Sequence, residues 1–439
     1  MGDRQSRPEL RARRVHAYAA SFGEDLAGGL IARFTRRGSL VLDPFAGAGT
    51  TLLQARLLGR GAICIDVDPV ACLIAKVLST SYTPNELDEL RETMEEQLGE
   101  IETALCSCVI SDEVWRAGVA FSVNGIIGRL PKNNQIEFWF APVQRAVIAV
   151  LVELAESWED SRLKNVVRLA ISSAIIHKWP HTLSQAMDVD HSRPHRVLRD
   201  DLSVQSQMDV FRRTFRGVIR TLRKLNERVA GQAVPLLVIE GDSTVEVGKL
   251  KENSVDYVLT SPPYFNAIDY PRAHQFSKWW LWPERSNLKR SEYTGLRSGG
   301  TDGSVTELCE AVIPCNIGGV SRLRAVSMSR YRALCRYVLD LDALLGGTKR
   351  ALRSGKVASL VLANNSIRAV TVPVVEIVCE LLDRHGFAGI ATERRQINVS
   401  RRRYPYGLKG FRGLMDTEYV IHARKPARRR SRAAGRGRM

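Results

Sequence analysis

The amino-acid sequence predicts an α/β protein with a doubly wound, mostly parallel sheet and a helical insertion. Two observations predict this fold. Short apolar runs of strand character alternate with helical segments in the first ninety residues and again after residue 234, as expected for parallel strands joined by crossover helices. Residues 86–233 lie between these two parts and have the apolar periodicity of long helices.

The first part of the sheet domain is assigned to residues 1–85. The run 38–43 is apolar and ends at an acid followed by a proline, which is typical of a buried parallel strand. A helix is expected from residue 50 to about residue 59, and a second strand at 62–66. Strand, helix and strand in this order open a doubly wound sheet.

The helical insertion is assigned to residues 86–233. Thr83 and Pro84 fit the cap and the first position of its first helix. Long helices are expected at 86–105, 143–158, 163–179 and 210–229.

The remainder of the sheet domain is assigned to residues 234–423. Strands are expected at 234–239, 255–260, 357–363 and 419–423, and helices at 331–352 and 373–385. Pro373 fits the first position of the last helix and Gly386 its end. The stretch 265–323 is rich in Gly, Ser, Arg and Trp, and is expected to be an irregular loop insertion.

The chain has a formal net charge of +17, which bears on its partners and not on its fold. Eight of these charges lie in the last sixteen residues, 424–439, which contain no acid. This tail lacks a hydrophobic face and is expected to be disordered. It could serve only to solubilise the protein, but the body of the chain is basic as well. We therefore favour non-specific binding to phosphates.

Membrane, secreted and disulfide-rich classes are disfavoured. No apolar run approaches the roughly 18 residues of a spanning helix, and the N-terminus is arginine-rich and lacks the apolar core of a secretion signal. The eight cysteines are scattered and form no Cys-x-x-Cys pair. A cytoplasmic location is expected, with no metal.

The segment Asp43–Thr51, which we call the glycine loop, connects the first strand to its helix. Gly47 and Gly49 let the backbone turn tightly and approach a ligand closely, and the helix N-terminus behind them offers free N–H groups. The glycines alone would also fit a plain tight turn. The third glycine of the dinucleotide fingerprint is absent, and so is the Gly-Lys-Ser/Thr of a phosphate loop.

The strand at 255–260 runs into Ser261–Tyr264, the Ser-Pro-Pro-Tyr motif. Pro262 and Pro263 fix the backbone and donate no N–H, so this turn offers carbonyl acceptors. Taken alone, the motif would fit a stiff turn or a peptide-recognition segment. Here it follows a buried strand in a chain that already carries the glycine loop.

Together, the glycine loop and the Ser-Pro-Pro-Tyr motif resemble those of S-adenosylmethionine-dependent DNA amino-methyltransferases. The resemblance implies a Rossmann-like class I methyltransferase fold with S-adenosylmethionine as cofactor. It implies cofactor contacts for Tyr18, Asp43, Pro44, Phe45, Gly47, Gly49, Thr50, Asp66 and Asp242. The segment 16–22 is similar to the short motif that closes over the methionine end of the cofactor in this family.

The resemblance also implies roles within the cofactor site. Phe45 would pack near the cofactor, and Asp43 with the two loop glycines would surround its methionine part. Asp66 stands at the end of the second strand and suits the ribose hydroxyls, whereas Asp242 would accept from the adenine amino group. Asp68 fits either a second acid of this site or a helix cap.

In the catalytic half, the resemblance implies that the Ser261 side chain and the Pro262 carbonyl accept hydrogen bonds from the target amino group. Tyr264 would stack on the flipped base. Asn266, Asp269, Tyr270, Trp279 and Trp280 extend the segment. They could line the base pocket, or the two tryptophans could belong to the core.

The expected activity is methylation of an exocyclic amino group in double-stranded DNA, with the 4-amino group of cytosine favoured over the 6-amino group of adenine. A cognate restriction or defence nuclease is a further candidate partner. One alternative is an RNA base methyltransferase, although no appended RNA-binding domain is recognisable. Another is a non-catalytic DNA-binding protein on the same fold, which the intact motifs disfavour. Either insertion could recognise the target sequence.

Three weaker patterns remain. The pairs His177/His181 and His191/His195 enclose Asp188 and Asp190, but Pro180 and Pro194 interrupt them, so a zinc site is disfavoured. Pro314–Cys315 resembles the nucleophile of carbon-5 cytosine methyltransferases, but the catalytic strand already ends in Ser-Pro-Pro-Tyr. Six arginines interleave with three aromatic residues near the last strands. This pattern suits contacts with phosphates and bases, and it suits a solvated basic face equally well. The residues are Arg394, Arg395, Arg401, Arg402, Arg403, Arg412, Tyr404, Tyr406 and Phe411.

Overall fold

The structure is a computed structural model. It describes residues 12, 15–18, 22–107, 121–123, 126–128, 130–131, 133, 135–177, 181–186, 202–265, 270–285, 294, 303–312, 317–367, 370–396 and 417–427. None of the helices in these ranges combines the length and the apolar character that a membrane crossing requires.

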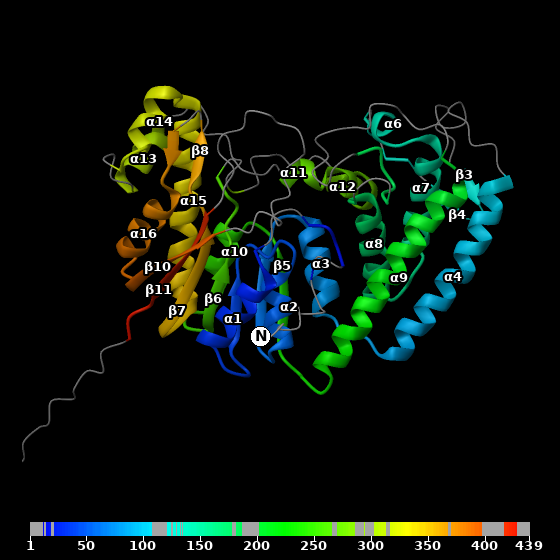
Figure 1. Cartoon of the computed structure of the whole chain (residues 1–439), viewed down its shortest axis with the longest axis horizontal. Helices are drawn as coiled ribbons and strands as arrows, with labels where there is room; N and C mark the ends of the chain where they lie inside the picture. The colour runs from blue at the N-terminus through cyan, green and yellow to red at the C-terminus, as the bar shows by residue number, and fades with distance from the viewer. Residues whose placement is uncertain are drawn as a thin grey trace, which may run out of the picture.

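A sheet in the order β10-β11-β7-β6-β1-β2-β5 forms the centre of the molecule (Figure 1). Its strands are β1 (Leu40–Asp43), β2 (Gly61–Asp66), β5 (Leu236–Glu240), β6 (Val255–Thr260), β7 (Leu352–Leu362), β10 (Ala388–Gln396) and β11 (Thr417–Arg424). Every neighbouring pair from β5 to β7 is parallel, and β11 is antiparallel to both β7 and β10. The predicted doubly wound, mostly parallel sheet is confirmed.

The strand order reverses between β1 and β6. From β1 the chain continues to β2 and β5 on one side, and from β6 it continues to β7 on the other. In sheets of this kind, ligands bind outside the carboxyl ends of the strands at such a switch point. Asp43 ends β1 and Thr260 ends β6, so the glycine loop and the Ser-Pro-Pro-Tyr motif both begin there.

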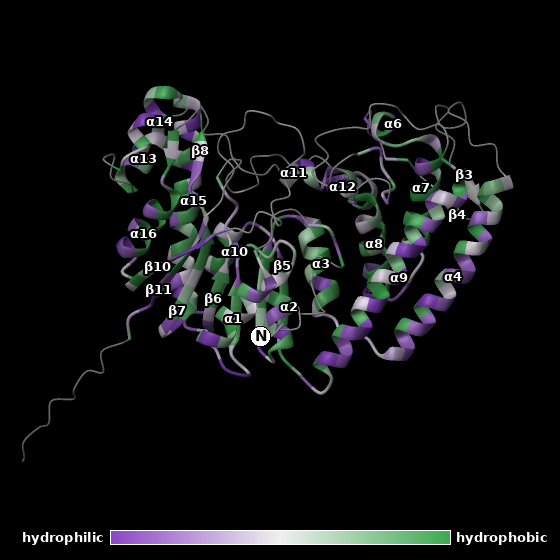
Figure 2. Cartoon of the chain, in the orientation of Figure 1, coloured by the Kyte–Doolittle hydropathy of each residue, from purple (hydrophilic) through white to green (hydrophobic). Residues whose placement is uncertain are grey.

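Successive residues of a strand point to opposite sides of the sheet. Because the strands carry apolar residues on both sides, helices cover both faces. Val41 belongs to the hydrophobic core on one face and Leu42 to the core on the other. The first face packs against α1 (Glu24–Phe34), α2 (Thr50–Leu57) and α3 (Pro69–Ser79). The second packs against α10 (Ser243–Lys249), α15 (Met328–Ala351) and α16 (Val374–Arg384). Figure 2 shows hydrophobic residues concentrated in the strands.

The helices between β2 and β5 lie beside α3, to the right of the sheet in Figure 1. They are α4 (Pro84–Ser107), α6 (Ile136–Trp139), α7 (Pro142–Glu156), α8 (Ser161–Ile175) and α9 (Val204–Val229), accompanied by the strand pair β3 (Phe121–Val123) and β4 (Ile126–Gly128). Their apolar side chains join the core of the first sheet face. The predicted cap of α4 is present: Glu86 N–H donates to Thr83 Oγ1 at 3.2 Å, and Thr83 N–H donates to Glu86 Oε2 at 2.7 Å.

The expectation of an irregular stretch at 265–323 is wrong in part. The structure has helices there: α11 (Tyr270–Ala273), α12 (Gln275–Leu281), the 3₁₀ turn η2 (Pro283–Arg285), α13 (Gly303–Val312) and α14 (Val320–Val326). The sequence of α12 gives no alternation of exposed polar and buried apolar residues to reveal it, because Ser277 and Lys278 are buried together with the apolar residues around them. Strand β10 and the hairpin of β8 (Asn365–Ile367) and β9 (Val370–Val372) were not predicted either.

Candidate active site

Asp43 joins the two halves of the candidate site. Its buried carboxylate Oδ1 accepts hydrogen bonds from Phe45 N–H at 3.1 Å and from the Thr260 hydroxyl at 2.7 Å. Burial raises the pKa of Asp43 to about 6, although the hydrogen bonds that it accepts act in the opposite direction. The end of β1 is therefore tied to the end of β6 directly in front of Ser261.

The glycine loop has the conformation that its glycines make possible. Gly47 has φ +46° and Gly49 has φ +73°, both in the left-handed region. A Cβ atom on Gly49 would lie 3.1 Å from Leu78 Cδ1. The loop then enters α2, where Thr50 is buried and its Oγ1 has no hydrogen-bond partner in the part of the chain that the structure describes. A narrow backbone cradle with an unsatisfied polar atom fits a bound cofactor.

Asp66 holds the loop from the neighbouring strand. Its Oδ2 accepts from Gly47 N–H at 2.8 Å and its Oδ1 from Asp68 N–H at 2.9 Å. Burial, and next the negative charge of Asp68, raise the pKa of Asp66 to about 7. Further hydroxyl donors would stabilise its carboxylate form.

Tyr18 lies against the glycine loop. A Cβ atom on Gly47 would lie 3.3 Å from Tyr18 Cε1. The buried tyrosine also contacts the ring of His274, with ring centroids 4.4 Å apart and an interplanar angle of 44°. Sequence reasoning did not single out His274.

Asp242 stands next to the end of β2, because Gly241 N–H donates to Asp66 O at 2.9 Å. Its carboxylate Oδ1 also caps α10, accepting from Thr244 N–H at 2.9 Å and from the Thr244 hydroxyl at 2.7 Å. The adjacent Ser243 hydroxyl donates to the carbonyl of Pro44, which fastens the glycine loop to α10. No local pattern in the sequence pointed to Ser243.

The two ends of the Ser-Pro-Pro-Tyr motif contact each other, and the residue after the motif is held by Asn365. Ser261 is half-buried and its side chain is hydrogen-bonded to Tyr264. Burial, and next the charge of Glu418, raise the pKa of Tyr264 to about 12. Directly after the motif, the Asn365 side-chain amide donates to the Phe265 carbonyl. Sequence reasoning also missed this asparagine.

Phe265 is buried against Tyr337, with ring centroids 5.5 Å apart. Trp279 and Trp280 are 5% and 3% exposed, and the Trp280 ring packs on Phe140 at 5.6 Å. Of the two alternatives for the tryptophans, the structure favours the core. Asn266 and Asp269 lie outside the described residues.

Asp68 acts as a helix cap: its Oδ1 accepts from Val70 N–H at 2.9 Å at the start of α3. His177 and His181 have ring centroids 6.3 Å apart, and His181 contacts Arg213. Within the described ranges, no three side chains are grouped as metal ligands. The second histidine pair, Pro314–Cys315, residues 397–416 and the tail beyond residue 427 lie outside the described residues.

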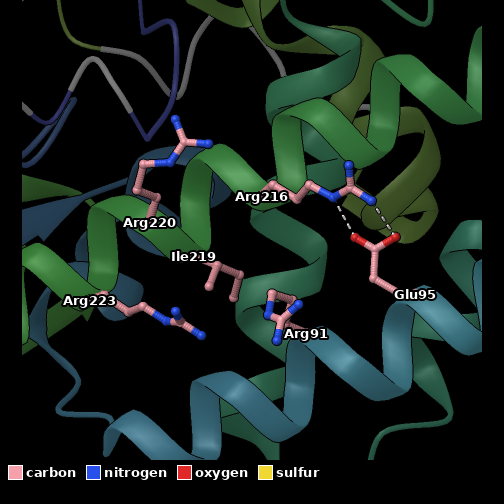
Figure 3. A pocket seen from close by; sticks show the side chains of 6 residues that line it. All are labelled: Arg91, Glu95, Arg216, Ile219, Arg220 and Arg223. Atoms are coloured by element: carbon pink, nitrogen blue, oxygen red, sulfur yellow. Dashed lines mark hydrogen bonds and ion pairs between the residues drawn. The ribbon is translucent and has the colours of Figure 1, made fainter.

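A separate pocket lies between α4 and α9 (Figure 3). Its lining consists of Arg91, Glu95, Arg216, Ile219, Arg220 and Arg223. The Arg216 guanidinium makes a two-pronged pair with Glu95 at 2.6 and 2.8 Å. One turn beyond Arg223, the Asn226 amide donates to Tyr82 O, just beyond the C-terminal end of α3. That end of α3 faces away from the carboxyl ends of the strands, so this pocket is not part of the candidate site.

Comparison with known proteins points to DNA methylases. A family model described as DNA methylase, of the N6/N4 methyltransferase type, matches residues 3–77. The type II methyltransferase M.MvaI of Kocuria varians is 21% identical over 376 residues, which are 82% of this chain and 77% of that protein. The type II methyltransferase M.BsoBI of Geobacillus stearothermophilus is 20% identical over 348 residues, covering 74% of this chain and 62% of the relative.

Among solved structures, a DNA modification methylase from Thermus thermophilus, complexed with S-adenosyl-L-methionine, shares 15% identity. The match covers 43% of this chain and 55% of the other, with a TM-score of 0.24. A likeness this slight carries no argument about the present chain.

Proposed function

Because the chain belongs to the N6/N4 DNA methylase family, we propose that it transfers a methyl group from S-adenosylmethionine to the exocyclic amino group of a flipped base in double-stranded DNA. The observation that carries this proposal is the hydrogen bond between Thr260 and Asp43, at 2.7 Å. It brings the glycine loop and the Ser-Pro-Pro-Tyr motif together at the switch point of the sheet.

The bound cofactor would supply an electrophilic methyl group on a positively charged sulfonium. Asp66 would accept hydrogen bonds from the ribose hydroxyls and Asp242 from the adenine amino group. Tyr18 and the glycine loop would enclose the methionine part. This arrangement fits the left-handed glycines, which let the backbone of the loop turn tightly, and the contact of Tyr18 with Gly47.

The chemistry proposed for the catalytic half is activation of a weak nucleophile. The lone pair of an aromatic amine is delocalised into its ring, and acceptors for its two N–H groups restore its nucleophilicity. Ser261 and the Pro262 carbonyl would be these acceptors, and Tyr264 would stack on the base. The hydrogen bond between Ser261 and Tyr264 would give way when the base enters. Most of the acceleration would come from positioning.

Electrostatics favour an approach of DNA from the carboxyl ends of the strands. The chain is strongly basic, which favours contact with phosphates. The arginine-rich segment 397–416 is flanked by Gln396 and Thr417. These two residues pair with each other beyond the carboxyl end of β7, so the segment starts and ends on that side of the sheet. We assign recognition of the target sequence to the helical insertion or to residues 265–323. The reaction would take place in the cytoplasm, with a cognate nuclease as a further partner.

The test is transfer of radiolabel from S-adenosylmethionine to unmethylated duplex DNA, followed by digestion and mass spectrometry of the bases. We expect label on the 4-amino group of cytosine, the base that serine in the motif favours over adenine. Ser261→Ala and Tyr264→Ala should abolish it. Ser254→Ala is the matched control, because Ser254 precedes the opposite end of the same strand. Label on RNA but on no DNA would instead indicate an RNA methyltransferase.

A further inference from the structure

A network of buried polar side chains lies behind the glycine loop. Asp68 and His274 form its centre: Asp68 Oδ2 and His274 Nδ1 are 2.7 Å apart, and both residues are at most 1% exposed. Asp68 caps α3, and His274 precedes α12. The pair therefore joins a helix of the sheet domain to the segment that follows the Ser-Pro-Pro-Tyr motif.

A second branch connects the N-terminal segment to the insertion. His16 Nε2 lies 2.9 Å from the hydroxyl of Ser172 in α8, which donates at 2.8 Å to the hydroxyl of Ser277 in α12. Lys278 is also buried. Burial alone would raise the pKa of Asp68, but His274, with smaller contributions from Lys278 and a backbone N–H, holds it at about 2.

This network is not the most stable way to fill a core. His274 Nε2 and His16 Nδ1 are buried without a hydrogen-bond partner among the described residues. Each such atom costs about 1–3 kcal/mol, and apolar residues of similar volume often fill a buried site with no loss of stability. Stability alone therefore does not account for these side chains.

The network touches the glycine loop at two points. The His274 ring packs on Tyr18, which in turn contacts Gly47. Asp68 N–H donates to Asp66 Oδ1, while Asp66 Oδ2 accepts from Gly47 N–H. Asp66 is held by the backbone N–H of Asp68, whereas His274 contacts the Asp68 carboxylate. Displacement of His274 would thus be transmitted to the loop through the tyrosine ring.

We propose that His274 is a positioning residue for the cofactor: its hydrogen bond to Asp68 and its ring contact with Tyr18 hold the N-terminal segment against Gly47. This inference rests on the proposed function, because it takes the space beside Tyr18 and Gly47 as the place of the methionine end. His274 does not touch the reacting atoms. Its effect is confined to the amino-acid part of the cofactor.

The test compares two ligands by calorimetry on the full chain. S-adenosylmethionine has the amino-acid end, and 5′-methylthioadenosine lacks it. His274→Leu removes both the hydrogen bond and the ring contact, and should weaken the binding of S-adenosylmethionine by about tenfold or more. The affinity for 5′-methylthioadenosine should stay within about twofold. His274→Asn, which keeps a donor for Asp68, and His274→Phe, which keeps a ring for Tyr18, should each restore part of the affinity.

His385→Leu is the matched control, because it breaks another His–Asp pair, with Asp342 at 2.9 Å, on the other face of the sheet. It should leave both affinities unchanged. Equal losses for the two ligands in His274→Leu, or no loss for either, would overturn the inference. If that variant does not fold, the asparagine and phenylalanine variants carry the same comparison. A wild-type chain that binds neither ligand would refute the proposed function itself, and this inference with it.

Discussion

Asp66 should make cofactor binding depend on pH. Its carboxyl accepts backbone hydrogen bonds from Gly47 and Asp68, yet burial and the nearby charge of Asp68 raise its pKa from the usual 3.8 to about 7. Ribose hydroxyls donate to a carboxylate more strongly than to a neutral carboxyl. The bound state therefore favours the ionised form, and binding near neutral pH releases a proton from Asp66.

The sign and size of the effect follow from this pKa. Affinity rises with pH up to the pKa of the free protein and then levels off. With a pKa of about 7 for Asp66, about one carboxyl in eleven is ionised at pH 6 and about ten in eleven at pH 8. The association constant for S-adenosylmethionine should thus increase by about tenfold between these values, which is the equivalent of one pKa unit.

Calorimetric titrations at pH 6, 7 and 8, each in two buffers of different ionisation enthalpy, measure both the affinity and the protons released. Asp66→Asn keeps an oxygen that can accept from Gly47 but cannot ionise. In this variant the contribution of Asp66 to the pH dependence should vanish, so the difference between wild type and variant isolates it from other titrating groups. A wild-type affinity that is equal at pH 6 and pH 8, or an unchanged slope in Asp66→Asn, would refute the reasoning.

Four further variants probe other parts of the structure. Asn365→Ala releases the Phe265 carbonyl after the Ser-Pro-Pro-Tyr motif, and steady-state kinetics should show kcat lowered by about 10–100-fold with the cofactor Kd unchanged. Gly49→Ala places a side chain at φ +73° and should lower the free energy of unfolding, measured with denaturant, by about 1–2 kcal/mol. Gly217 lies within a helix, where a Cβ would meet open space. Gly217→Ala should therefore raise the free energy of unfolding by about 0.5–1 kcal/mol. Arg216→Ala removes an exposed ion pair and should change the free energy of unfolding by less than about 1 kcal/mol. The KM for DNA should not change in that variant, and an increase of several-fold would place DNA against α4 and α9 instead.

The sequence predicts those parts of the molecule whose signal is local. The strand before the glycine loop and the strand before Ser261 are buried on both faces, so each is a mostly apolar run that ends in a recognisable turn. By contrast, β10 is an edge strand with mostly exposed residues. Its sequence therefore lacks the apolar signature by which the other strands were found.

The contacts that complete the candidate site lack a local signal for a different reason. His274 meets Asp68 across 206 positions of the chain, and Asn365 meets the Phe265 carbonyl across 100. Neither residue belongs to a motif, and a single histidine or asparagine in a helix or loop is unremarkable in a sequence. Only the packing of α12 and of β8 beside the two motifs brings these side chains to the candidate site.

The order of the segments makes the two halves of the site interdependent. The strand that carries the glycine loop is paired with β6, which lies more than two hundred residues further along the chain, beyond the whole insertion. The Thr260 hydroxyl supplies a hydrogen bond to Asp43, and Ser243 supplies one to Pro44. Both donors come from the part of the chain that carries the catalytic motif. We therefore expect the glycine loop to acquire this conformation only when β5 and β6 are in place, so the proposed cofactor binding and base activation would depend on the same folded unit.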